Sequence, residues 1–282
     1  MHILLSTAYF PPIQYFAALS ASVGRCSFSV RSGGSAEGRC PAWLPSSLRD
    51  SGTGPFAYIE ACENYQKQSY RNRCHFYSAS GLQSLSFPVV HENGTHALPI
   101  TGIRVDYSRP WLLQHKRAII SAYRTSAFFE YYQDELFAVM DRRPDTLWEL
   151  NMSLIRFFLD KLGLPVELRP TSEFTVSSGI CPPSGSSVGT GLFPDAETPS
   201  VTGRPSVSGR TWSGLPYDEA LDACDLRETI HPKRPDDILE RLRLKKPYFQ
   251  VFSRKYGFIQ NLSIMDLLFN EGPDAVSYLL LR

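Results

Sequence analysis

The sequence predicts an α/β or α+β fold, in which a mixed sheet is flanked by helices and interrupted by two long Gly/Ser-rich insertions. Short apolar runs that suit buried strands are followed by longer segments of helical periodicity. Glycine, serine and proline concentrate in residues 22–55 and 175–215, which have no apolar period. The 282 residues could form one large domain or two small ones, and we expect a single domain over residues 1–282.

Five short segments are expected to be strands. They combine apolar, β-branched and aromatic residues, and polar or glycine-bearing links join several of them. The segments are residues 3–6, 57–61, 74–78, 85–90 and 102–107. Asn93-Gly94 favours positive-φ turn geometry, which indicates a hairpin near residues 92–94.

Three helices are expected in the middle of the chain. The first begins after Pro110, which suits a first helical turn because it has no N–H to leave unpaired. A second amphipathic run extends from Phe128 to Met140. The third begins at Thr146, a candidate N-cap, and ends at Gly163.

The two insertions, residues 22–55 and 175–215, are expected to be flexible. Without apolar periodicity they cannot bury enough surface to offset the entropy lost on ordering. The segment from Ser177 to Gly214 is therefore expected to be dispensable for folding. A lid over the substrate, closing through Trp212, is the alternative, since long loops in compact domains are often lids.

Charge and cysteine content exclude several classes of function. A formal net charge of +1 gives no overall field that would attract nucleic acid or an anionic membrane, so any anion binding must come from a local cluster. The six cysteines include no C-x-x-C pair, so we expect reduced thiols, no metal site and no disulfide framework. No dinucleotide loop or Walker motif occurs, and no cofactor is expected. Pro11-Pro12 interrupts the N-terminal apolar run, which argues against a signal peptide or a membrane span.

The first candidate site is the loop of residues 9–16, directly after the first predicted strand. Its Gln14 offers both a donor and an acceptor, and open α/β sheets bind ligands where central strands end. A hydrophobic corner with an exposed glutamine is an equally good interpretation of these residues.

The second candidate is the basic segment of residues 63–73. Lys67, Arg71 and Arg73 supply donors for phosphate or carboxylate, and Asn72 can recognise hydroxyl groups. Such a mixture suits an anionic, hydroxyl-rich ligand such as a nucleotide sugar. The alternative is a solvated charged loop, but such a loop would normally hold several acidic residues, whereas here only Glu63 is acidic.

The third candidate lies on the first predicted helix. Trp111, His115, Lys116 and Tyr123 follow at spacings that can share a face. His115 has the chemistry of a general base near neutral pH. The alternative is a surface helix with ordinary histidine and lysine residues, which is the default for a lone histidine.

The stretch of residues 247–273 sets polar groups among many aromatic residues. Within it, Asn261 and Ser263 are expected to open a short apolar helix that stops at residues 270–272. This stretch resembles the C-terminal signature of the WbqC-like family, known mainly from bacterial surface-polysaccharide gene clusters. The loop that holds Gln14, the basic segment before the strand at residue 74 and the helix with His115 are similar to family segments. The resemblance covers residues 1–20, 57–172 and 217–282.

The resemblance implies a cytoplasmic protein of bacterial surface-polysaccharide (O-antigen or lipopolysaccharide) biosynthesis. It would transfer an acyl or aminoacyl group to a nucleotide-linked amino sugar, so its partners would be a nucleotide sugar and an acyl donor. His115 would act on the acceptor, and the substrate would contact Gln14, Lys67, Arg71, Asn72, Arg73, Lys116, Tyr123 and Asn261. A non-catalytic sugar-nucleotide or partner-binding protein is the alternative, and thiol catalysis through Cys62 or Cys74 is a third hypothesis.

Overall fold

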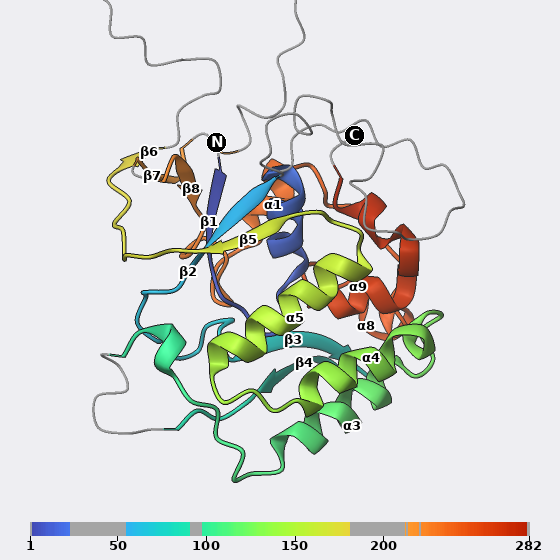
Figure 1. Cartoon of the computed structure of the whole chain (residues 1–282). Coiled ribbons are helices and arrows are strands. Elements are labelled where there is room, and N and C mark those ends of the chain that lie inside the picture. The colour runs from blue at the N-terminus through green and yellow to red at the C-terminus, as the bar shows by residue number, and fades with distance from the viewer. Residues whose placement is uncertain are drawn as a thin grey trace, which may run out of the picture.

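The computed structural model describes residues 2–22, 55–90, 98–180, 212, 214–219 and 221–280. These residues form a mixed six-stranded sheet flanked by helices, together with a separate two-stranded hairpin (Figure 1). The arrangement confirms the predicted α/β class. The hairpin predicted near residues 92–94 and most of both predicted insertions lie outside the described residues.

The large sheet is built around the first strand of the chain. Its strands, in their order across the sheet, are β5 (Glu167–Pro170), β2 (Phe56–Glu60), β1 (His2–Ser6), β8 (Ala223–Asp225), β7 (Pro216–Asp218) and β6 (Gly179–Ile180). β1 pairs in parallel with β2 on one side and with β8 on the other. β7 and β6 extend the β8 side with antiparallel pairing. The strand order therefore reverses at β1, where open α/β sheets place their ligands.

Helices and the hairpin complete the core. The helical elements are α1 (Ile13–Ser22), η2 (Ile100–Gly102), α3 (Trp111–Tyr123), α4 (Phe129–Asp141), α5 (Leu147–Lys161), α7 (Asp237–Arg241), α8 (Ser253–Tyr256), α9 (Ile264–Glu271) and η3 (Gly272–Tyr278). The hairpin of β3 (Arg73–Ser78) and β4 (Gly81–Ser86) packs beside α3, at the opposite end of the molecule in Figure 1 from β6 and β7. α1 contacts α7 and α9, and α4 contacts α5, so their buried faces form one apolar core.

The predicted helix boundaries are confirmed where a capping residue marks them. The side chain of Thr146 accepts a hydrogen bond from the Glu149 N–H at 3.2 Å and so caps α5. Gly163 follows that helix with a φ of 63°, which a residue with a Cβ adopts only with strain. Ser263 caps α9 in the same way, by accepting from the Met265 N–H.

Two of the predicted strands need correction. Residues 102–107 do not form a regular strand: η2 occupies residues 100–102, and Arg104 and Val105 make only isolated bridges. The segment predicted at residues 85–90 contributes only its start to β4, which begins at Gly81. Apolar alternation marked these segments as half-buried, but it did not determine whether a neighbouring strand was available to pair with them.

The fold also includes both ends of the second predicted insertion. Ser177 hydrogen-bonds to Asp225, and β6 pairs with β7. Trp212 is buried in the core, which does not agree with a mobile lid residue.

Cys224 is disulfide-bonded, so the expectation of reduced thiols fails for this residue. Of the helices that the structure describes, none combines the length and apolar character needed to span a bilayer.

Gly272 provides a test of the packing between the C-terminal segment and α4. It has a φ of 56°, and a Cβ at this position would lie 2.5 Å from the Phe128 ring. We expect Gly272→Ala to lower the free energy of unfolding by about 3 kcal/mol, since backbone strain and overpacking add. Gly163→Ala is the matched control, because its φ is 63° and no heavy atom lies within 4 Å of its Cβ. It should cost about 1 kcal/mol.

Urea denaturation of both variants measures the difference. Equal losses for the two substitutions would mean that the Phe128 ring moves aside without cost, and that the C-terminal segment is loosely packed there.

Candidate functional site

The candidate site lies where β1, β2 and β8 end at the same edge of the sheet. Ser6 ends β1, Glu60 ends β2 and Asp225 ends β8. Because the three strands are parallel, their carboxyl ends meet at one edge.

A pocket of about 460 Å³ opens beside this edge. This volume lies within the range of small-molecule sites. Its lining residues are Cys62, Glu63, Asn64, Gln66, Phe174, Asp225, Arg227 and Glu228. The lining therefore consists of three acidic and two amide side chains, with one guanidinium, one aromatic ring and one thiol.

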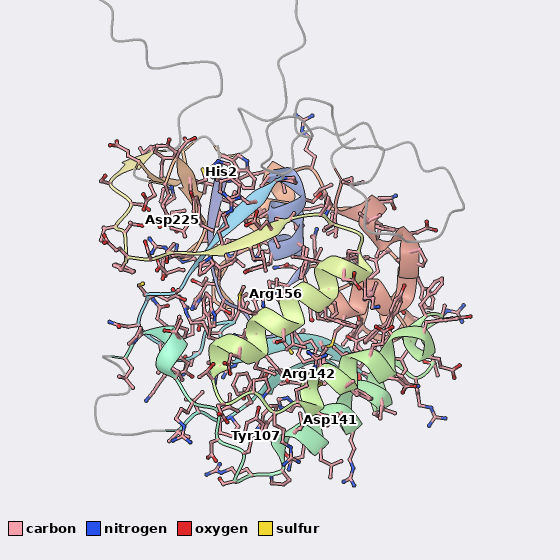
Figure 2. All side chains as sticks on the ribbon, viewed as in Figure 1. His2, Tyr107, Asp141, Arg142, Arg156 and Asp225 are labelled. Atoms are coloured by element: carbon pink, nitrogen blue, oxygen red, sulfur yellow. The ribbon has the colours of Figure 1, made fainter. Side chains whose placement is uncertain are left out.

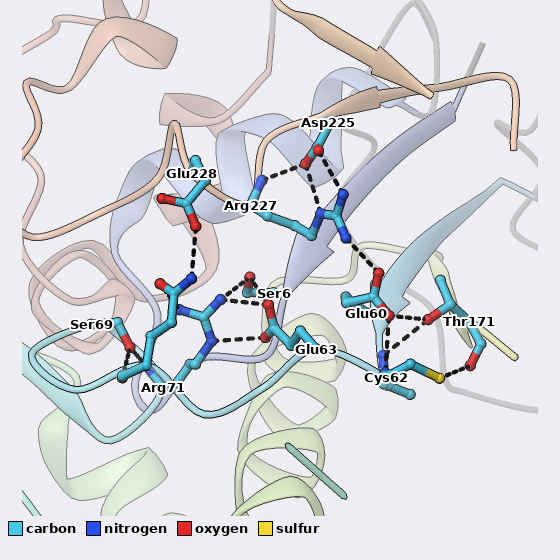
Figure 3. Close-up of polar contacts among 12 residues, drawn as sticks. Ser6, Glu60, Cys62, Glu63, Ser69, Arg71, Thr171, Asp225, Arg227 and Glu228 are labelled. Atoms are coloured by element: carbon cyan, nitrogen blue, oxygen red, sulfur yellow. Dashed lines mark hydrogen bonds and ion pairs between the residues drawn. The ribbon is translucent and has the colours of Figure 1, made fainter. Parts of the chain in front are cut away.

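Arg227 joins the ends of β8 and β2. Its Nε and Nη2 donate to the two carboxylate oxygens of Asp225 at 3.0 and 2.8 Å, and its Nη1 donates to Glu60 at 2.6 Å (Figure 3). Glu60 is fully buried and also accepts from the Thr171 hydroxyl and from the Cys62 N–H. Burial would raise the pKa of Asp225, but hydrogen bonds from Arg227 and Ser177 hold that pKa below its ordinary value.

Arg71 forms a second buried cluster beside the first. Its Nε donates to Glu63 at 2.8 Å, its Nη2 contacts Glu63 and Ser6, and its Nη1 donates to Gln66 at 3.1 Å (Figure 3). Gln66 in turn donates to Glu228 at 3.0 Å. This chain of hydrogen bonds connects the end of β1 to the mouth of the pocket.

In both clusters every guanidinium nitrogen has an acceptor. The two arginines therefore anchor and neutralise carboxylates, and they hold Glu63 and Asp225 in fixed positions. Glu228 differs, because its side chain is about half exposed and its described hydrogen bond comes from an uncharged amide. Arg234 Nη2 lies 3.9 Å from Glu228 Oε2, and an exposed ion pair at this distance holds the Glu228 carboxylate only weakly.

Arg71 lies directly behind the pocket, but none of the nine predicted site residues lines it. In the basic segment, Lys67 is exposed, Asn72 donates to the Phe87 carbonyl at 2.9 Å, and Arg73 begins β3 half-buried.

The backbone N–H of Gln14 donates to Asn261 Oδ1 at 3.0 Å, so the structure brings these two predicted residues together. The side chain of Gln14 is fully buried, not an exposed corner residue.

His115 lies in the core and not on a helix surface. Its side chain is 4% exposed, and Nδ1 lies 2.8 Å from the Tyr9 hydroxyl. Burial lowers the pKa of His115 to about 4, against a smaller opposing effect of a hydrogen bond to the Ser86 backbone. The imidazole is therefore neutral at pH 7 and accepts from Tyr9. Its predicted role as a general base stays a prediction.

The remaining two predicted residues of α3 lie in different surroundings. Lys116 pairs with Asp141 and lines a separate pocket of about 440 Å³ together with Arg109 and Arg143. Tyr123 is buried, and its hydroxyl accepts from the Tyr77 N–H. Figure 2 shows Asp141 and Asp225 in widely separated parts of the molecule, so the two pockets are distinct.

The polar groups of the C-terminal stretch form a buried network around Asp266. Tyr248 donates to its carboxylate at 2.6 Å and Gln250 donates at 3.2 Å. Burial raises the pKa of Asp266 to about 6, although these hydrogen bonds oppose the shift. Gln250 also donates to the Ile259 carbonyl, so the network fixes the turn that precedes α9. Many polar residues of this stretch are thus explained by internal hydrogen bonding.

The pocket residues that sequence reasoning missed come mainly from β8 and the turn after it. Asp225 ends a strand of only three residues, which carries no readable alternation, and Arg227 and Glu228 lie in the turn after it. A signal did exist at Cys62, which lies two residues after the end of β2, a strand that the sequence predicts.

Comparison with known proteins agrees with the resemblance noted above. A family model described as the WbqC-like protein family matches residues 57–180. This region is WbqC-like. No curated protein and no solved structure matches the chain. The WbqC-like region contains Glu60, Cys62, Glu63 and Arg71, whereas Asp225 and Arg227 lie outside the matched range.

The buried His115 and Asp266 predict opposing effects of pH on stability. With a folded pKa of about 4, His115 remains neutral where the unfolded chain, with a pKa of 6.5, takes up a proton. The free energy of unfolding should therefore fall between pH 7 and pH 4, by about 3 kcal/mol from this group. Asp266 has a folded pKa of about 6 and an ordinary value of 3.8, so it stabilises the fold as the pH falls through the same range.

Urea denaturation between pH 4.5 and 7 separates the two contributions. His115→Gln should reduce the loss of stability on acidification, and Asp266→Asn should increase it. Only the slope against pH is compared, because either substitution also changes packing. A wild-type slope in His115→Gln would show that this imidazole titrates as if exposed.

Proposed function

We propose that the pocket at the carboxyl edge of the sheet binds an amino sugar, and that the protein transfers an acyl or aminoacyl group to the sugar's amine. The acceptor would be nucleotide-linked, and the reaction would belong to surface-polysaccharide biosynthesis in the bacterial cytoplasm. The observation that carries this proposal is the lining of the pocket. The lining carries three carboxylates, those of Glu63, Asp225 and Glu228, against the one guanidinium of Arg227. Arg71 and Arg227 hold the carboxylates of Glu63 and Asp225, so the half-exposed carboxylate of Glu228 is the one left most open to a ligand.

This lining favours a ligand that donates hydrogen bonds. Ammonium and hydroxyl groups can donate to the exposed carboxylate of Glu228, whereas a phosphate would be repelled by it and by the excess of carboxylates over guanidinium in the lining. The amide of Asn64 can pair with a further hydroxyl group, whereas the amide of Gln66 already bonds to Arg71 and Glu228. Phe174, which is 55% exposed, offers an apolar surface to one face of a sugar ring. The nucleotide diphosphate would therefore extend out of the pocket.

Acylation of an amine requires a proton acceptor. The amine nitrogen attacks the acyl carbonyl carbon, the bond to the leaving group breaks, and the leaving group takes up one proton of the nitrogen; before this attack the bound ammonium must give up a proton to become the nucleophile. Glu228 is suited to receive that proton, because it lies at the pocket and no arginine holds it closely. The acceptor could receive the group directly from its donor or from a thioester on Cys62, which is free, half-buried and part of the same pocket.

A non-catalytic binding protein is the alternative function. The absence of any histidine among the described residues that line the pocket favours it. Binding without turnover would use the same carboxylates and the same amides.

Ligand binding and transfer test these proposals separately. Nucleotide-linked amino sugars should raise the melting temperature, with about 2.7 kcal/mol of stabilisation at one hundred times the dissociation constant. The N-acetylated counterparts should bind at least tenfold more weakly, because they lack the ammonium group. The Glu228→Gln variant should bind the nucleotide-linked amino sugar more weakly than the wild type by a similar factor. Glu130→Gln, an exposed carboxylate on α4, is the matched control and should bind as the wild type does.

Mass spectrometry of the sugar after incubation with an acyl thioester measures transfer. Loss of transfer in Cys62→Ser with binding retained would support the thioester route. Binding without transfer by the wild type, over a range of donors, would favour the non-catalytic alternative. Equal binding of the amine and of its N-acetyl counterpart would refute the assignment of the pocket.

A further inference from the structure

Residues 243–258 form a basic and aromatic strip on the surface, which lies outside the matched family range. This segment has five basic residues and no Asp or Glu, although the whole chain is almost neutral. The basic side chains are Arg243, Lys245, Lys246, Arg254 and Lys255, and all are exposed. Lys245 lies 3.4 Å from Glu240, Glu271 accepts from the Phe249 N–H, and the buried Asp266 accepts from Tyr248 and Gln250.

Aromatic rings are exposed among these charges. Phe249 is 61% exposed, Tyr256 is 44% exposed and Phe258 is 38% exposed. Residues 254–258 are exposed without interruption, so most of α8 and the turn after it lie at the surface. Large apolar side chains in such positions need a partner more often than scattered surface residues do.

The strip is held on a rigid frame. Lys255 and Tyr256 both donate to the Ala79 carbonyl at the tip of the β3–β4 hairpin, at 3.2 and 3.0 Å. The Tyr77 hydroxyl donates to the Gly257 carbonyl at 2.7 Å. Phe258 packs edge-on against Tyr248, which belongs to the Asp266 network. In Figure 1, α8 lies near the hairpin and far from the β6–β8 edge of the large sheet.

We propose that this strip docks the protein peripherally on an anionic lipid surface. Lysine and arginine side chains are attracted to anionic headgroups, and exposed aromatic rings partition into the interfacial layer. A surface turn that carries both kinds of side chain can contact the headgroup layer. Single-stranded nucleic acid, the other common ligand of basic and aromatic surfaces, is normally held in a groove that follows its backbone. The strip is a turn and not a groove, so the lipid surface is the better fit.

Sedimentation of the full chain with lipid vesicles tests the proposal. The protein should pellet with phosphatidylcholine vesicles that contain phosphatidylglycerol, and not with phosphatidylcholine alone. Binding should weaken in high salt, because screening reduces the attraction between surface charges. Each basic side chain near the surface is worth roughly a fivefold change in partitioning, so Arg254→Ala with Lys255→Ala should weaken binding by roughly 25-fold.

Two further variants make the test specific. Arg142→Ala with Arg156→Ala removes the same charge from exposed positions at the C-cap of α4 and on α5, and should bind as the wild type does. Phe249→Ala should weaken binding without changing its salt dependence. The proposal fails if Arg254→Ala with Lys255→Ala binds like the control, or if neutral vesicles bind equally well. It also fails if a single-stranded oligonucleotide binds the strip and vesicles do not.

Discussion

The structure depends on two buried arginine–carboxylate clusters at the carboxyl edge of the large sheet. Arg227 ties Asp225 of β8 to Glu60 of β2, and Arg71 ties Glu63 to Ser6 of β1. Buried charges are tolerated only when they are paired, and removal of one partner typically costs about 3–5 kcal/mol. The clusters therefore favour the one arrangement in which these strand ends, distant in sequence, lie side by side.

The same clusters determine the chemistry of the pocket. Because the guanidinium of Arg71 uses its nitrogens on protein acceptors, it contributes little free positive charge there, and Lys67 and Arg73 of the same segment do not line the pocket. The carboxylates remain at the surface of the pocket in fixed orientations, which is the pre-organisation that a specific site needs. The sequence predicts an anion-binding site from the arginines of this segment, because it does not show that Glu63, the one acidic residue of the segment, occupies the guanidinium of Arg71.

Much of the fold could be predicted from the sequence, because local signals determine it. Thr146 and Gly163 mark the ends of α5 by capping chemistry, and the apolar stripe between them gives its buried face. The strands β5 and β8 have four and three residues, which are too few to show an alternating pattern. They are strands because β5 pairs with β2 and β8 pairs with β1. The pocket depends on β8, so it could not be derived from local signals.

Burial also could not be predicted for single polar residues. His115 has the helical spacing of a surface residue, but the Tyr9 hydroxyl supplies a hydrogen bond that makes its burial tolerable. The sequence marks Gln14 and Asn261 as candidate site residues by their chemistry. It does not predict that these two residues, distant in the chain, are joined by a hydrogen bond.

The extent of the WbqC-like region has a consequence for how the site is assembled. Residues 57–180 include most of β2, all of β5 and the hairpin, but they lack β1 and β8. In the large sheet these two strands lie between β2 and β7, so the matched region alone would leave the β1 side of β2 unpaired. It would also retain Glu60 and lose Arg227, leaving a buried carboxylate without its cation. The pocket is therefore a property of the whole chain, completed when β8 brings Asp225 and Arg227 to an edge that the WbqC-like region supplies only in part.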